Sequence, residues 1–257
     1  ERWLTTVRAV DPDVIATLES NQWWQDTVFA DLRAAYPHAV EVPQEDTYGM
    51  HLYSRLPLED VAVRRRVDDI VPSIEATVVL PSGSRVTAYV LHPMPPRPEF
   101  NQHTDRRDAE LILVAREVAA RREADPARPI IVAGDLNDVA WSRTTLLFQR
   151  LSGLLDPRKG RGPYSTFHAD YWPLRWPLDH VFHSDDLRLL HLERLGHVGS
   201  DHFPIHVAFV LDPAAAPYQN APEAEADDRE DAAAVLDEAA KRAAERDPEE
   251  EPAPEER

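Results

Sequence analysis

The sequence predicts an α/β protein in which two β-sheets are flanked by helices. Short runs of β-branched and aliphatic residues, typical of strands, are interspersed with longer stretches that carry apolar side chains at helical spacing. The two kinds of segment alternate unevenly, and a Pro-Ser-Gly-Ser turn joins two of the strands directly. This pattern favours two sheets over one doubly wound parallel sheet. With 257 residues, the chain can bury one large core or two smaller ones.

The expected strands and helices follow from this periodicity. Strands are expected at residues 14–18, 48–54, 74–80, 86–91, 130–133, 178–182, 187–192 and 203–211. Helices are expected at residues 1–10, 22–35, 105–122 and 141–151. These boundaries place several polar residues immediately after the ends of strands.

The stretch from Pro129 to Asn137, PIIVAGDLN, is the most informative of these strand ends. Its apolar run predicts a strand buried on both faces, and Gly134 allows a sharp turn after it. Asp135 and Asn137 then follow at positions i and i+2, so both side chains can face the same side. A carboxylate can hold a metal or accept a proton, and a carboxamide can donate to a phosphoryl oxygen. Asp and Asn also favour turns by themselves, and this stretch alone does not decide between the two interpretations.

Other strand ends carry similar side chains. Glu19 follows the strand at 14–18, His92 follows the strand at 86–91, and Asp179 lies in the strand at 178–182. Asp201 and His202 precede the last strand. Acids at the carboxyl ends of strands are typical of sites in open α/β proteins. Taken singly, Glu19 is better explained as the start of a loop, and His92 as a surface or capped histidine.

Two further segments are candidates for contact with a substrate. Asn101 lies in the loop before the helix at 105–122, and Arg106 and Arg107 lie in the first turn of that helix. Cations oppose the dipole at a helix N-terminus, which is consistent with binding an anion or with a solvated basic face. The long irregular segment 156–177 contains basic and aromatic residues, and it fits either a substrate rim or a packed Ω-like loop.

The distribution of charge limits the possible partners. Residues 212–257 hold 16 acidic and 5 basic side chains, a charge of −11, which leaves −7 of the total −18 for residues 1–211. An acidic domain disfavours strong nonspecific binding to long nucleic acids, which depends on neutralising phosphates. The segment 212–257 is rich in Ala, Glu and Pro and is expected to be disordered or loosely helical, without a catalytic role. Cysteine is absent, so disulfides and thiolate chemistry are excluded.

Six motifs occur in the order in which a known family has them. They read PDVIATLES, YGMHLYSR, VLHPMPP, GDLND, LDHVF and SDHFPI, and they span residues 1–211. In sequence and order they resemble the endonuclease/exonuclease/phosphatase superfamily, which has the DNase I-like fold. The resemblance implies a four-layer α/β sandwich over residues 1–211. It also implies hydrolysis of phosphodiesters or phosphomonoesters with Mg²⁺, for which Mn²⁺ is a possible substitute.

The resemblance assigns five catalytic residues by position. Asp135 matches the aspartate that orients or deprotonates the attacking water, and Asn137 matches the asparagine that contacts the scissile phosphate. Asp179 matches an aspartate near the active centre, and His202 matches the catalytic histidine. His92 matches a histidine that binds phosphate or donates a proton in some branches of the family.

The metal ligands are assigned in the same way. Glu19 matches the metal-binding glutamate, and Asp201 matches a second carboxylate on the metal side. Mg²⁺ prefers oxygen ligands and neutralises the charge that develops on a phosphate under attack, which agrees with these residue types. Arg107 and Asn101 are the expected substrate contacts.

One departure concerns the start of the chain. The family opens with a strand that ends in a metal-binding asparagine, whereas this sequence begins at the helix that follows that strand. We therefore expect the strand, and in a bacterial member also a membrane anchor, to lie upstream. The sequence itself contains no apolar run long enough to cross a bilayer. We expect a monomer that acts on a phosphate ester, with nucleic acid among the candidates, in the cytoplasm or at the membrane of a bacterium.

Two other function classes explain the sequence less completely than a phosphoesterase does. A catalytically silent scaffold that retains the fold agrees with the missing first strand but not with the complete set of acid, amide and imidazole residues. A glycosidase with a pair of carboxylates would explain two acids, but neither Asn137 nor the Ser-Asp-His motif. The sequence therefore favours a metal-dependent phosphoesterase.

Overall fold

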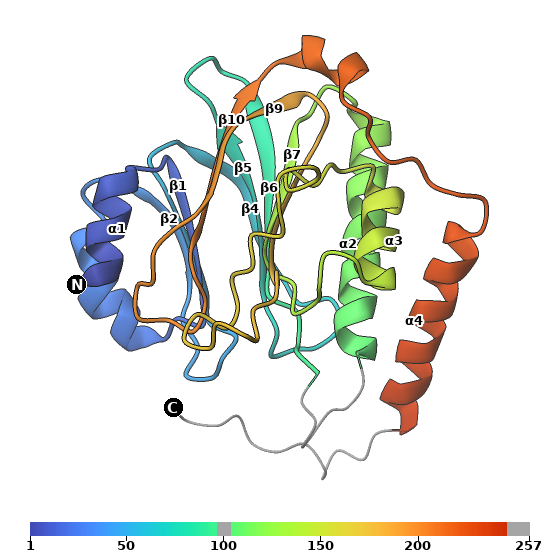
Figure 1. Ribbon diagram of the computed structural model, residues 1–257, viewed down its shortest axis with the longest axis horizontal. Helices are drawn as coiled ribbons and strands as arrows, with labels where there is room; N and C mark the ends of the chain where they lie inside the picture. The colour runs from blue at the N-terminus through green and yellow to red at the C-terminus, as the bar shows by residue number, and fades with distance from the viewer. Residues whose placement is uncertain (97–103, 246–257) are drawn as a thin grey trace.

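The computed structural model describes residues 1–96 and 104–245, which form successive helical and β layers (Figure 1). An N-terminal helical layer, a small β-sheet, a larger β-sheet and a second helical layer follow one another across the molecule. This arrangement confirms the α/β sandwich of the DNase I-like fold. Among the helices that the structure describes, none carries an apolar stretch long enough to span a bilayer.

The N-terminal part of the chain forms the first two layers. The small sheet is antiparallel, with the order β1 (Val14–Leu18), β3 (Met50–Ser54) and β2 (His38–Val42). Its outer face is covered by α1 (Arg2–Val10) and by the short helices η1 (Trp24–Val28) and η2 (Phe29–Asp31). Aromatic residues dominate the core between this sheet and the helices.

The larger sheet is mixed and provides most of the site. In order across the sheet, its strands are β4 (Leu58–Arg64), β5 (Ser73–Val79), β6 (Arg85–Leu91), β7 (Ile130–Asp135) and β8 (Asp179–His183). Only β6 and β7 are parallel neighbours within this sheet. The expected hairpin joins β5 to β6, and its strands are buried on both faces over most of their length.

The remaining elements complete the fold. Helix α2 (Asp105–Ala124) makes the crossover between β6 and β7, and α3 (Arg143–Ser152) packs beside it. Strands β9 (Leu187–Arg194) and β10 (Ile205–Leu211) pair antiparallel as a separate two-stranded sheet. Ser142 caps α3, because its hydroxyl accepts a hydrogen bond from the amide of Thr145.

Two apolar cores lie on the two faces of the larger sheet. One joins it to the small sheet and includes Met50, Leu52, Ile74 and Val90. The other joins it to α2 and α3 and includes the fully buried residues Leu111, Val114, Ile130, Val132 and Phe182. Burial on both faces explains why these strands read as continuous apolar runs in the sequence.

The expected α-helix at 22–35 was wrong. The structure has a π-helical turn followed by a 3₁₀ turn over Trp24–Val28 and Phe29–Asp31. The rings of Trp24 and Phe29 stack with centroids 5.9 Å apart, and Trp3 contacts both rings. A π turn brings residues five apart onto one face, so this aromatic packing replaces the regular helix.

Two strands were not predicted. Strands β2 and β4 are absent from the expected set, although Val40, Glu41 and Val42 of β2 alternate between apolar and polar. Both are edge strands of their sheets, with more exposed residues than the central strands. Because these two strands contain fewer buried apolar residues, their sequences carry a weaker strand pattern.

Within the segment expected to be disordered or loosely helical, the described residues up to Glu245 include a docked helix, and residues 246–257 lie outside the described part of the chain. After a 3₁₀ turn at Pro213–Tyr218, helix α4 (Asp228–Glu245) packs outside α2 and α3 (Figure 1). The buried Ala232 lies against Ile112 and Leu147, and Arg150 forms an ion pair of 2.7 Å with the buried Asp228. The apolar face of α4 is built largely from alanine and is therefore narrow. Such a face gives only a weak amphipathic pattern in the sequence.

Replacing Gly134 with alanine should destabilise the fold. Gly134 has a φ of 145°, and a Cβ atom there would lie 1.9 Å from the carbonyl oxygen of Leu91 in the neighbouring strand. We expect a loss of at least about 2 kcal/mol in the free energy of unfolding, measured by urea denaturation. Gly196→Ala is the control, because a Cβ at Gly196 meets no atom within 4 Å. Equal stability of the two variants would contradict the prediction.

Replacing Ala232 with glutamate tests whether α4 is docked. Ala232 is 0% exposed, whereas the neighbouring Ala233 is exposed. A charge at position 232 would lie in the apolar contact with α2 and α3, so we expect a loss of about 2 to 3 kcal/mol in unfolding free energy. Ala233→Glu adds the same charge on the solvent side and should change stability little. If the two variants behave alike, α4 does not pack as described.

Candidate active site

The register of the larger sheet places two aspartates opposite each other. Strands β7 and β8 are antiparallel, and Asp135 pairs directly with Asp179 at the end of β7 and the start of β8. Directly opposed side chains in such a pair lie on one face with Cβ atoms about 5 Å apart. Asp135 is only 6% exposed, and the side chain of Asp179 is 19% exposed. Two carboxylates therefore face each other in a site with little water.

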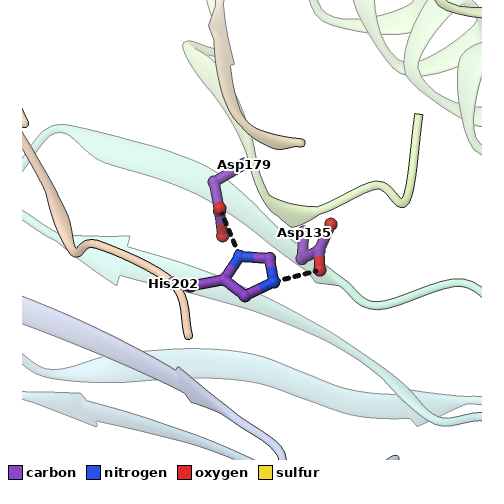
Figure 2. Close-up of side chains that lie close together, drawn as sticks. All are labelled: Asp135, Asp179 and His202. Carbon is purple, nitrogen blue, oxygen red and sulfur yellow. Dashed lines mark hydrogen bonds and ion pairs between the residues drawn. The ribbon is translucent and has the colours of Figure 1, made fainter. Parts of the chain in front are cut away.

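His202 lies between these carboxylates (Figure 2). Its Nδ1 atom is 2.7 Å from Oδ2 of Asp179, and its Nε2 atom is 3.5 Å from Oδ2 of Asp135. The ring of Phe167 contacts the imidazole, with centroids 4.9 Å apart. Three residues that were predicted to be catalytic, Asp135, Asp179 and His202, are thus brought together from segments far apart in the chain.

The charges in this cluster keep His202 protonated at neutral pH. Burial lowers the pKa of His202, but the hydrogen bond and charge of Asp179, with the charges of Asp135 and Asp201, raise it to about 9. Burial would raise the pKa of Asp179, but the hydrogen bond and the charge of His202, together with the hydrogen bond to Thr166, lower it. Burial, followed by the charge of Asp179, raises the pKa of Asp135 to about 7, and the charge of Glu19 adds to this effect.

His92 reaches the same carboxylate from the neighbouring strand. It follows β6, whose Leu91 pairs with Gly134 of β7, so His92 lies beside Asp135. Its Nε2 atom is 3.9 Å from Oδ2 of Asp135, and its buried ring contacts Tyr48. Two imidazoles therefore face one oxygen of Asp135.

Asn137 forms the turn after β7 in a left-handed conformation, with a φ of 51°. Its amide nitrogen donates to Oδ1 of Asp135 at 2.8 Å, and its Nδ2 atom donates to the carbonyl of Pro93 at 3.0 Å. The first bond fixes the Asp135 carboxylate with its other oxygen toward the two histidines. The second connects the turn to the segment that follows His92.

Arg107, which was predicted to contact substrate, braces the turn at Asn137; its contact with substrate stays a prediction. It is buried, and its guanidinium donates to the carboxylate of Asp108 and, at 2.7 Å, to the carbonyl of Asn137. The structure uses this residue to brace the Asn137 turn. Arg106 pairs with Asp68 at 2.7 Å, and Asn101 lies outside the described residues.

The two predicted metal ligands lie at the exposed side of the site. Glu19 follows β1 with a φ of 55°, and Asp201 precedes His202; both residues are exposed. Among the described residues, the cluster at this site whose possible ligand atoms all lie within 4.8 Å of one another is Asp135, Asp179 and His202. It does not include Glu19 or Asp201, so their metal role stays a prediction.

The residues present suit a divalent cation. The charges of Asp179 and Glu19 both raise the pKa of the buried Asp135, so negative charge is concentrated at this point. The donor atoms available to a cation are the carboxylate oxygens, because a protonated His202 cannot coordinate a metal, and the chain contains no cysteine. Mg²⁺ and Mn²⁺ prefer such hard ligands, and a cation would relieve the repulsion between the carboxylates.

The long loop predicted as a substrate rim is attached to His202. Phe167 makes isolated bridges to Trp176 and to His202, and the amide of Ala169 donates to the carbonyl of Asp201 at 2.6 Å. The tip of the loop is exposed, with Trp172 at 78%. Arg158, one of the basic residues of segment 156–177, is buried and donates to the carbonyl of Asp179.

One supporting residue was not singled out from the sequence. The hydroxyl of the buried Thr166 lies 3.3 Å from the amide nitrogen of Asp179 and accepts its hydrogen bond. Thr166 lies within the loop predicted as a rim, but no spacing links it to Asp179. Only the fold brings the two together.

Comparison with known proteins decides the family. The model of the Endonuclease/Exonuclease/phosphatase family matches residues 1–202. The chain belongs to this family. Its members are hydrolases that act on phosphate esters and depend on divalent metals. No curated protein matches the chain.

Solved structures of this family share the fold at low sequence identity. The human Nocturnin catalytic domain is 21% identical, with a TM-score of 0.65, and the match covers 81% of this chain and 85% of that chain. D. rerio TDP2, in a complex with a single-strand DNA product, is 16% identical with a TM-score of 0.65, over 81% of this chain and 90% of that chain. A protein of the same family from Beutenbergia cavernae is 20% identical with a TM-score of 0.63, over 82% of this chain and 66% of that chain.

The raised pKa of His202 predicts a pH dependence of stability in buffer with EDTA. A histidine whose pKa rises from 6.5 unfolded to about 9 folded stabilises the protein fully below pH 6.5, and this contribution is lost as the pH rises through 9. The pKa of Asp135 is about 7, so between pH 7 and 9 the change in unfolding free energy comes mainly from His202. We expect the unfolding free energy to fall by on the order of 2 kcal/mol across this range.

The matching variant is His202→Gln, which cannot titrate. The difference in unfolding free energy between wild type and this variant should shrink as the pH rises from 7 to 9. Parallel curves for the two proteins would show that His202 is not the titrating group.

Proposed function

We propose that this protein is a divalent-metal-dependent phosphoesterase that hydrolyses a phosphodiester or a phosphomonoester by direct attack of water. The observation that carries the proposal is the position of His202, held by Asp179 at 2.7 Å and facing Asp135 at 3.5 Å. This arrangement puts a protonated imidazole and a carboxylate of unusually high pKa side by side. One can stabilise negative charge while the other accepts a proton.

Asp135 is the proposed base. Its carboxylate is fixed through Oδ1 by the amide of Asn137, which leaves Oδ2 directed into the site. A pKa of about 7 suits a group that must take a proton from water near neutral pH and release it afterwards. Asp135 can orient the water for attack on phosphorus and accept its proton.

His202 is the proposed electrostatic stabiliser. Its Nδ1–H bond to Asp179 fixes the ring, so that Nε2–H points toward the space in front of Asp135. There it can donate to a phosphoryl oxygen as negative charge develops in the pentavalent transition state. His92 and Asn137 lie on the same side and are proposed as further phosphate contacts.

A divalent cation completes the proposal. We propose that Glu19 and Asp201, which are both exposed, hold it, while the carboxylate of Asp135 stays free to act as the base. When bound, Mg²⁺ or Mn²⁺ would neutralise the phosphate and lower the cost of bringing a nucleophile to it. The role of Asp201 as a ligand and the identity of the metal are part of this proposal.

The proposed substrate class includes two kinds of phosphate ester. Hydrolysis of a small phosphodiester and hydrolysis of a short single strand of nucleic acid both agree with the site. The single-strand DNA product bound to D. rerio TDP2 makes a short oligonucleotide a direct candidate. The acidic domain disfavours long duplexes, which require many phosphate contacts.

Hydrolysis of bis-p-nitrophenyl phosphate and p-nitrophenyl phosphate tests the function. Turnover should require Mg²⁺ or Mn²⁺ and be lost in EDTA, and the preferred ester would distinguish a diesterase from a monoesterase. Asp135→Asn and His202→Ala should each lower kcat at least about 100-fold. The first removes the general base, and the second removes the imidazolium that stabilises negative charge in the transition state.

Matched controls are available on the surface. Asp125→Asn and His191→Ala change the same residue types at exposed positions, and both should retain activity. Metal-independent turnover, or full activity in the Asp135 and His202 variants, would refute the proposal. No turnover, together with no stabilisation by Mg²⁺ in thermal unfolding, would identify a silent scaffold instead.

A further inference from the structure

A buried polar network lies directly behind the catalytic aspartates. Its members are Asp156, Arg158 and His180, all of which are buried. The guanidinium of Arg158 pairs with the carboxylate of Asp156 at 2.9 Å, and its Nη2 atom lies 2.6 Å from Nδ1 of His180. Nε2 of His180 lies 2.8 Å from the carbonyl oxygen of Asp138.

The direction of these hydrogen bonds is fixed by chemistry. Arginine only donates, so Nδ1 of His180 must accept from Arg158. The carbonyl of Asp138 only accepts, so Nε2 of His180 must carry the proton and donate it. His180 is therefore held in a single tautomer, and its ring connects Arg158 to Asp138 as a rigid spacer.

The network connects the two strand ends that carry Asp135 and Asp179. Nη1 of Arg158 donates at 3.2 Å to the carbonyl of Asp179, the aspartate that holds His202. Asp138, at the other end, follows Asn137 in the turn that fixes Asp135. The turn after β7 and the start of β8 are thus joined through side chains in addition to the strand ladder.

We propose that Asp156, Arg158 and His180 act as positioning residues, which set the separation of Asp179 from the Asp135–Asn137 turn and so hold His202 in its working position. The proposal rests on the phosphoesterase function stated above and adds residues that touch neither substrate nor metal.

Stability alone does not explain this network. A buried ion pair is commonly no more stabilising than apolar residues of the same volume, because both ions lose their hydration. A polar network with fixed bond directions does, however, define geometry sharply. Supporting residues behind a catalytic group commonly contribute 10- to 100-fold to activity.

Substitutions at His180 separate the two bonds. His180→Asn keeps an acceptor near the Nδ1 position, His180→Gln keeps a donor near the Nε2 position, and His180→Leu keeps neither. We expect the leucine variant to lower kcat about 10- to 100-fold with KM changed less than about threefold. The asparagine and glutamine variants should each recover part of that loss.

His183→Leu is the matched control. His183 is buried on the same strand, at the end away from Asp179, and its Nδ1 lies 2.9 Å from the carbonyl oxygen of Ser184. It should lower thermal stability without lowering kcat. If His180→Leu and His183→Leu reduce kcat alike, or if asparagine and glutamine at position 180 recover nothing, the positioning role is refuted.

A second measurement does not depend on turnover. The Nδ1 proton of His202, hydrogen-bonded to Asp179, should give a downfield ¹H resonance that is assigned by its loss in His202→Gln. We expect this resonance to shift or broaden in His180→Leu and in Arg158→Lys, and to stay unchanged in His183→Leu. An unchanged resonance in the His180 and Arg158 variants would overturn the inference. A perturbed resonance in a protein that hydrolyses no ester would support the positioning network while refuting the proposed function.

Discussion

The site depends on one electrostatic constraint, which is the approach of two buried carboxylates across a β ladder. The pairing of Asp135 with Asp179 is set by backbone hydrogen bonds, so their Cβ atoms cannot separate without breaking the sheet. Repulsion between them is balanced by the imidazolium of His202. The raised pKa of His202, the raised pKa of Asp135 and the lowered pKa of Asp179 all result from this single arrangement.

Much of the surrounding structure keeps this arrangement from relaxing. Gly134 lets β6 approach β7 closely enough to bring His92 beside Asp135. Arg107 braces the turn at Asn137 from helix α2, and the network through Arg158 ties the same region to β8. The buried charge is concentrated at the ends of the neighbouring strands β7 and β8, in a sheet whose backbone is fixed by two apolar cores. A rigid frame of this kind is what catalysis by preorganised charges requires.

The sequence predicted the fold class and the residues that meet at Asp135, because each lies in a short motif at a strand end. It could not predict the partner of Arg107, since a guanidinium in a first helical turn suits an anion as well as the carbonyl of Asn137. The docking of α4 was equally hidden, because alanines become an apolar face only against Ile112 and Leu147. Long-range contacts and the shape of facing surfaces decided these features, and local patterns do not contain them.

The attachment of the loop at Phe167 has an evolutionary consequence. Because Phe167 bridges both Trp176 and His202, an insertion beside it would displace the imidazole from its carboxylates. The tip of the loop, residues 170–173, makes no such bridge and presents the exposed aromatic side chains of Tyr171 and Trp172. Relatives with new substrate preferences should therefore differ in the length and composition of this tip, while the segment around Phe167 keeps its spacing.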